Sequence, residues 1–162
     1  MNVETLLVNA CAAKLEQLTG RIATCLTKLS EDQIWARGNE SENAVGNLVL
    51  HLIGNVRQRT TAALGGQPDT RQRDTEFLTE GGIPAPELTA KLQATIQDAT
   101  GIIRKLTADQ LLKTYEIQGL PQNGVELLVN VTEHFGQHTG QIIYATKQLT
   151  GKDLDLTMPR KR

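Results

Sequence analysis

The sequence predicts an all-α protein, a four-helix bundle with a long crossover connection between its second and third helices. Four long segments carry apolar residues three and four positions apart, which is the spacing of one helix face. Capping signals and glycines separate these segments, and no stretch is convincing as a strand. The polar run 67–83 is too long for a tight turn between helices and therefore predicts the crossover.

The first helix is expected from Val3 to about Leu29, with its apolar residues in the seam pattern of a bundle helix. Cys11 and Cys25 both fall in that seam, so we interpret them as small buried core residues without a redox role. The run 30–33 (Ser-Glu-Asp-Gln) has the form of a capping box, which predicts a short helical turn that carries Trp35.

The second helix is expected from about residue 42 or 44 to Leu64, with Ser41 or Asn43 as its N-cap. The glycine pair 65–66 would end it. The third helix should begin near the Pro-Ala-Pro stretch 84–86, because proline is favoured in a first turn.

A second capping box at 107–110 predicts another short turn, and the segment 115–119 could be extended. The fourth helix is expected to follow Asn123 as its cap and to end at Gly151.

The 162 residues fit one domain, which we place at 1–152 with a C-terminal tail at 153–162; its last residues, 158–162, would be a solvated end. A net charge of -1 argues against a nucleic-acid partner, and 3% aromatic residues are too few for a base-stacking surface. No apolar run is long enough to span a membrane, and Glu4 stands where a signal peptide would carry a basic residue. Two cysteines form no disulfide framework, which favours a cytoplasmic protein.

The three histidines of the chain fall at positions that a bundle could bring together. His134 and His138 are four residues apart on the fourth helix, so they project from one face, and that face also carries apolar residues. His51 is on the second helix, again on a face that can point to the core. Three histidines from two helices could hold one divalent ion and leave positions open for water or substrate. The alternative is that they are packed, hydrogen-bonded core residues without a metal.

Asn55 is a candidate for a hydrogen bond to a ligand imidazole, or equally to a neighbouring backbone group. Gln141 lies on the histidine face and could orient a metal-bound water, and Tyr144 is a further candidate; both could equally be ordinary, partly buried polar residues. Gly136 and Gly140 fall nearly opposite the histidines, and we interpret them as a packing notch, which would fit a homodimer interface.

Charged residues at 71–76 lie in the long connection, and we interpret them as a solvated loop. The alternative is that this stretch covers the mouth of the metal site. An arginine would then receive an anionic group, or Glu76 would reach the site.

Two segments, 43–55 (NAVGNLVLHLIGN) and 133–142 (EHFGQHTGQI), give the chain a resemblance to the DinB-like (DinB/YfiT) superfamily of bacterial four-helix proteins. Trp35 and the segment 71–77 are similar to one branch whose activity is unassigned. The resemblance covers nearly the whole chain. It implies a metal held by one histidine of the second helix and an HxxxH pair of the last, which correspond to His51, His134 and His138.

The resemblance also implies two reaction classes, since characterised relatives include transferases that use low-molecular-weight thiols and some hydrolases. We therefore expect a metal-dependent enzyme with a small-molecule substrate, with a non-catalytic, metal-stabilised binding or scaffold bundle as the alternative. No side chain is an evident general base. Three imidazoles suit zinc, nickel, iron and copper, and we expect zinc or nickel ahead of iron or another ion.

Overall fold

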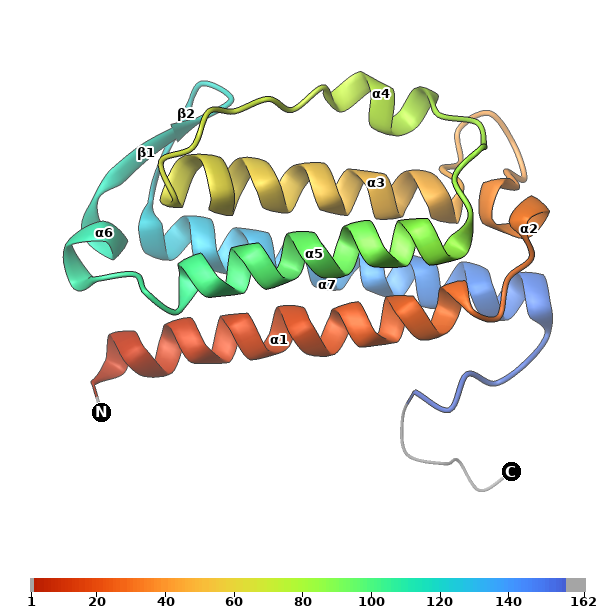
Figure 1. The fold of residues 1–162 in the computed structure, drawn as a ribbon, viewed down its shortest axis with the longest axis horizontal. Helices are drawn as coiled ribbons and strands as arrows, with labels where there is room; N and C mark the ends of the chain where they lie inside the picture. The colour runs from red at the N-terminus through yellow and green to blue at the C-terminus, as the bar shows by residue number, and fades with distance from the viewer. Residues whose placement is uncertain (1, 157–162) are drawn as a thin grey trace.

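The computed structural model describes residues 2–156, and it is a bundle of long helices with one small hairpin (Figure 1). The elements, in chain order, are α1 (Val3–Leu26), α2 (Glu31–Trp35), α3 (Val45–Val56), the π-helix η1 (Arg57–Leu64), α4 (Arg73–Leu78), α5 (Ala85–Ile103), α6 (Ala108–Leu112), β1 (Thr114–Ile117), β2 (Leu120–Asn123) and α7 (Gly124–Thr150). The predicted fold class is therefore confirmed, with η1 continuing α3 as one rod and residues 67–83 crossing over it. The predicted solvated end, 158–162, lies outside the described residues.

The core lies where α1, α3, α5 and α7 face one another. Its largest fully buried side chains are leucines, isoleucines and Phe135. Cys11 and Cys25 are buried in α1, as their place in the seam predicted, and burial raises the pKa of the Cys25 thiol. Leu154, in the segment after α7, also packs into the core. No helix within residues 2–156 is long and apolar enough to cross a membrane.

Several predicted helix ends agree with the structure. Ser30 and Thr107 cap α2 and α6 with both hydrogen bonds of a capping box. Asn123 caps α7 through Glu126, and Gly151 ends that helix with a φ of 63°, a left-handed conformation that glycine adopts without strain. The 27-residue α7 therefore has the predicted bounds, and it carries two of the three histidines.

The predicted N-cap of the second long helix is wrong. Neither Ser41 nor Asn43 caps it; Ala44 holds the cap position and has no side chain to accept a hydrogen bond. Asn47, three residues further on, instead accepts from the Ala44 N–H at 3.2 Å. Asn47 is wholly buried and thus secures the start of α3 from inside the helix.

A hairpin stands where the sequence offered only a short extended segment. β1 and β2 pair antiparallel around Gln118 and Gly119, whose φ angles of 55° and 77° are both positive, as in a type I′ turn. The hairpin leads directly into α7, and its tip reaches η1, where Gln118 Nε2 donates to Gln58 Oε1 at 3.2 Å.

Within residues 2–156, no other segment packs closely on Gly136 and Gly140 in the way that the expected notch requires. A Cβ at Gly136 would make only an ordinary contact, 3.9 Å from Leu18 Cδ1, and a Cβ at Gly140 would meet nothing within 4 Å. A close contact does occur at Gly46, where the Trp35 ring would lie 2.7 Å from a Cβ. Trp35 also donates from its indole N–H to the Ile83 carbonyl, which ties α2 to the end of the crossover.

We predict opposite effects for alanine at two helical glycines. Gly46→Ala should lower the free energy of unfolding by about 1–3 kcal/mol, because the added methyl group forces Trp35 out of its place. Gly140→Ala should raise it by roughly 0.5–1 kcal/mol, because nothing opposes the added methyl and alanine favours helix. Urea unfolding followed by circular dichroism measures both. Equal effects at the two positions would contradict the close packing of Trp35 on α3.

Candidate metal centre

The three histidines meet between α3 and α7. His51 is buried on α3, and His134 and His138 are partly buried one turn apart on α7. Their rings lie 4.4 to 5.0 Å apart between centroids, and one ring nitrogen from each lies within 4.8 Å of the others. Among the described residues, this group has the donor set and the spacing to hold a metal ion, as the helix positions predicted.

The interpretation of residues 71–76 as a solvated loop is wrong for Arg71 and Glu76, although residues 72–75 are exposed; the alternative, in which Glu76 reaches the site, agrees with the structure. Residues 73–78 form α4, which lies along α3, and the side chains of Arg71 and Glu76 are over nine-tenths buried. Arg71 binds the Glu76 carboxylate through two nitrogens, with Nε 2.7 Å from Oε1 and Nη2 2.8 Å from Oε2. A buried carboxylate and guanidinium need each other as partners, so the pair explains how a polar stretch folds against the bundle.

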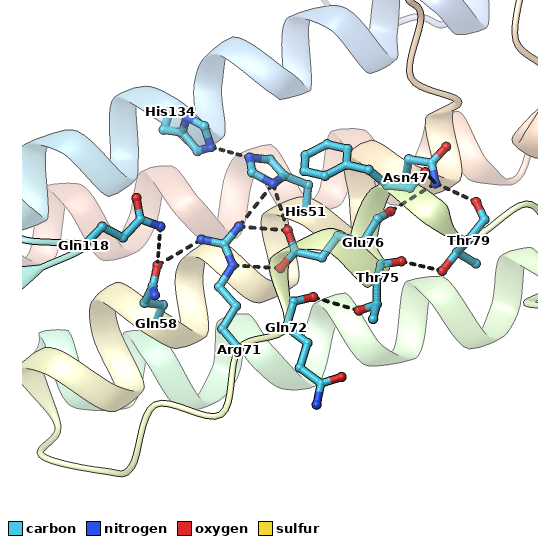
Figure 2. A network of polar contacts seen from close by, with 11 residues as sticks. Asn47, His51, Gln58, Arg71, Gln72, Thr75, Glu76, Thr79, Gln118 and His134 are labelled. Carbon is cyan, nitrogen blue, oxygen red and sulfur yellow. Dashed lines mark hydrogen bonds and ion pairs between the residues drawn. The ribbon is translucent and has the colours of Figure 1, made fainter. Parts of the chain in front are cut away.

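Glu76 also contacts the histidine cluster, as Figure 2 shows. Its Oε2 lies 2.9 Å from His51 Nδ1. Arg71 Nη2 also lies 3.2 Å from His51 Nδ1, but it donates over a shorter distance, 2.8 Å, to Glu76 Oε2. Because a carboxylate only accepts hydrogen bonds, we assign the proton of His51 to Nδ1, which leaves the lone pair of Nε2 facing the other histidines. This is the carboxylate–histidine arrangement that orients metal-binding imidazoles in many proteins.

Gly54 makes the approach of Glu76 possible. A Cβ at this position would lie 2.8 Å from Glu76 Cδ and 3.0 Å from Arg71 Nε, so only glycine leaves room for the ion pair against α3. Asn47 adds a second anchor, because its Nδ2 donates to the carbonyls of Glu76 and Thr79 at 3.0 and 2.7 Å. The crossover is thus positioned by polar groups of α3.

His138 is oriented from the opposite side of the cluster. Gln141 Oε1 lies 2.6 Å from His138 Nδ1, and an amide oxygen accepts, so Nδ1 carries the proton here as well. Nε2 of His138 is therefore free to bind a metal. Gln141 thus contacts a histidine of the cluster, which differs from the role in orienting a metal-bound water that the sequence suggested for it.

The other two candidate orienting residues lie differently. Tyr144 is 67% exposed on α7 and lines a surface groove together with Gln141. Asn55 is buried one turn beyond His51, and its Oδ1 has no hydrogen-bond partner among the described residues. Neither makes a hydrogen bond to a histidine in the part of the chain that the structure describes.

Two of the imidazoles, those of His51 and His134, are held in the neutral form that metals bind. Burial, helped by the two other histidines and by the positive charges of Arg59 and Arg71, lowers the pKa of His134 to about 4. Burial also lowers the pKa of His51, although its hydrogen bond to Glu76 acts in the opposite direction. Near pH 7 the two rings are therefore uncharged, and no proton has to leave before an ion binds.

The geometry fits a small divalent ion. His51 Nε2 and His134 Nε2 lie 2.9 Å apart. Two nitrogens bound to one tetrahedral zinc at about 2.0–2.1 Å would lie about 3.3 Å apart, so a shift of a few tenths of an ångström opens the site. Without an ion one of these nitrogens must carry a proton toward the other; with an ion both lone pairs have a partner.

Comparison with known proteins identifies the family. The family described as protein of unknown function (DUF1572) matches residues 2–162, nearly the whole chain. The chain belongs to the DUF1572 family. No curated protein matches it.

Solved structures show where the DUF1572 fold belongs. A conserved protein from Enterococcus faecalis matches with a TM-score of 0.77 at 15% identity, over 94% of this chain and 99% of its own. A DinB-like protein from Bacillus subtilis, YjoA, matches with a TM-score of 0.68 at 16% identity, over 89% and 93% of the two chains. The fold is thus that of a DinB-like helical bundle, as the sequence resemblance indicated.

The low histidine pKa predicts a loss of stability in acid. The unfolded chain binds a proton at His134 near its ordinary pKa of 6.5, whereas the folded chain binds it only near 4. Between these values the unfolded state holds more protons, so the free energy of unfolding falls as the pH falls. We expect His134→Gln to remove roughly 1 kcal/mol of the loss between pH 6.5 and 5, a figure reduced for solvent screening of the partly exposed ring.

Urea unfolding in the presence of a chelator at several pH values measures this slope. The window above pH 5 avoids most titration of carboxylates such as Glu16 and Asp69, whose pKa values are lowered by hydrogen bonds to their partners. Parallel slopes for the natural protein and His134→Gln would show that this ring titrates alike in both states.

Proposed function

We propose that this protein is a metal-dependent enzyme that holds one divalent ion, zinc or nickel ahead of iron, through His51, His134 and His138. The observation that carries the proposal is the tautomer pattern. Glu76 Oε2 and Gln141 Oε1 accept hydrogen bonds from the Nδ1–H groups of His51 and His138, so the Nε2 lone pairs of these two rings face the cluster. A core that only packed its histidines would not need this arrangement.

Three protein ligands favour catalysis over a structural role, because structural zinc is usually closed by four protein ligands. A divalent ion here would lower the pKa of a thiol or water, so that a nucleophile exists near pH 7. The chain's own groups would keep the imidazoles neutral and oriented. Glu76 is already bound to Arg71 and His51, so it is not placed to act as a free general base.

The reaction class follows from the three-histidine ligand set and from the engagement of Glu76 with Arg71 and His51. We propose thiol transfer or hydrolysis of a small molecule: in the first, the sulfur of a thiol bonds to an electrophilic carbon as the bond from that carbon to the leaving group breaks, and the leaving group departs with the bonding electrons and takes up the thiol's proton through solvent. Both reactions need an activated nucleophile and little further acid–base chemistry, which suits a site without a free carboxylate. A metal-stabilised bundle without turnover is the outcome that the experiments must exclude.

Metal binding is the first test. Purified protein dialysed against zinc or nickel should hold one ion per chain, measured by elemental analysis, and its melting temperature should rise as ligand binding stabilises the folded state. The double variant His134→Ala, His138→Ala should lose the ion while keeping its helical circular dichroism. An unchanged melting temperature with no bound ion would contradict the proposal.

Thiol-plus-electrophile and ester-hydrolysis assays, with and without chelator, then distinguish a metal-dependent enzyme from a non-catalytic bundle.

The Glu76 contact gives a second, sharper prediction. Gly54→Ala should lower metal affinity by roughly 10- to 100-fold, because the added methyl forces Glu76 and Arg71 away from α3. Glu76→Gln should also lower it, since the charge that orients His51 is lost. Competition with a chromophoric chelator measures affinity. Gly140→Ala, where a Cβ meets nothing within 4 Å, is the matched control. Equal affinity in all four proteins would show that Glu76 has no part in the site.

A further inference from the structure

Two cavities in the described residues adjoin the metal centre's supporting side chains, and they differ in how they reach the histidines. The larger, about 770 Å³, lies between the crossover, η1 and α5. Arg71 and Glu76 form part of its wall, and the same two side chains contact His51. A molecule in this cavity would therefore meet the ion pair before it met a histidine.

The second cavity is a groove of about 620 Å³ between α3 and α7, called here the α3–α7 groove. It is lined by Val45 and Leu48 of α3, by Gln141, Tyr144 and Ala145 of α7, and by the loop after α2. Leu48 lies one turn from His51, and Gln141 lies one turn from His138 and binds it. The groove thus continues the histidine stripe along both helices.

The groove has a mixed lining of apolar and uncharged polar side chains, with few free charges. Val45 and Leu48 are buried beneath it, and the exposed Tyr144 presents a ring at its side. Arg37 and Glu42, at the loop side, carry opposite charges, and both already bond within the chain: Arg37 to Asn47 and the Phe77 carbonyl, Glu42 to the Gly38 N–H. Such a surface favours an uncharged apolar group over an anion or a cation.

We propose that the α3–α7 groove binds the body of the substrate, and that this body is aromatic or branched and uncharged. This inference rests on the proposed function, because the substrate's head group would bind the ion held by the three histidines. The body extends from His138 past Gln141 toward Ala145. The groove's volume suits a small molecule of this kind.

Two hydroxamates, used with cobalt(II) as the bound ion, test whether the α3–α7 groove binds the body of the substrate. Cobalt(II) in the site gives a visible spectrum that changes when a hydroxamate binds, so the readout needs no turnover. Acetohydroxamate carries the head group alone, and phenylpropionohydroxamate adds a phenyl ring. We expect the phenyl compound to bind roughly ten-fold tighter or more, the gain from burying most of one ring.

Matched variants show which cavity gives rise to the tighter binding of the phenyl compound. Ala145→Trp should fill the α3–α7 groove and remove the preference, with acetohydroxamate affinity and cobalt content unchanged. Ala62→Trp, which fills the larger cavity, should leave the preference intact. Tyr144→Ala, at an exposed position where folding is not at risk, should reduce the preference several-fold.

The outcomes separate the two proposals. Protein that binds no cobalt overturns both. Bound cobalt with equal affinity for the two hydroxamates overturns the groove alone, and so does a preference that Ala62→Trp removes and Ala145→Trp does not. Bound cobalt with the preference lost only in the α3–α7 groove variants supports the assignment.

Discussion

The hydrogen bond between Glu76 and His51 is the contact on which the rest of the site depends. It joins the crossover, which has few apolar residues, to a buried position of α3. A carboxylate in such a place needs a cation and hydrogen-bond donors, and Arg71 and His51 supply both. Gly54 supplies the space, and Asn47 fixes the backbone of the same segment. The crossover is therefore folded mainly by polar complementarity with α3.

The hydrogen bond from His51 to Glu76 also determines which ring nitrogen of His51 carries a proton. With Nδ1 of His51 donating to Glu76 and Nδ1 of His138 donating to Gln141, the two rings present the same nitrogen to the centre. Burial and nearby positive charge keep the pKa of His134 low, so adding a proton is an unfavourable way to relieve the crowded lone pairs. A divalent ion could bind these lone pairs without adding a proton to any ring. Near neutral pH the three imidazoles could therefore hold a divalent ion.

The long helices and the histidine cluster could be predicted from the sequence because both depend on local spacing. Apolar residues at helical intervals place His51, His134 and His138 on facing helices, and side-chain caps such as Ser30 and Asn123 mark helix ends. The N-cap at Ala44 could not be read in this way, because its hydrogen bond comes from Asn47 inside the helix. The π-helical winding of η1 likewise leaves no mark in the apolar pattern.

From the sequence, Glu76 at the site is only the alternative to a solvated loop. A charged stretch in a long connection has the same composition whether it is solvated or buried. Whether it is buried depends on polar partners elsewhere in the chain, such as His51 for Glu76. The available signals lay elsewhere in the chain: a glycine at position 54 inside a helix that otherwise favours larger residues, one turn from a histidine, implies that something approaches closely there.

The two sides of the histidine cluster have different consequences for any ligand. On the His51 side, Glu76 and Arg71 are tied to each other, and the Phe77 ring lies 4.9 Å from the imidazole, so α4 and the crossover close that approach. On the His138 side, the orienting residue is Gln141, an uncharged and exposed side chain next to an open groove. A carboxylate there would repel an incoming thiolate, whereas an amide orients the imidazole without that repulsion. The ion pair that supports His51 and the open groove beside Gln141 are thus on opposite sides of the same three rings.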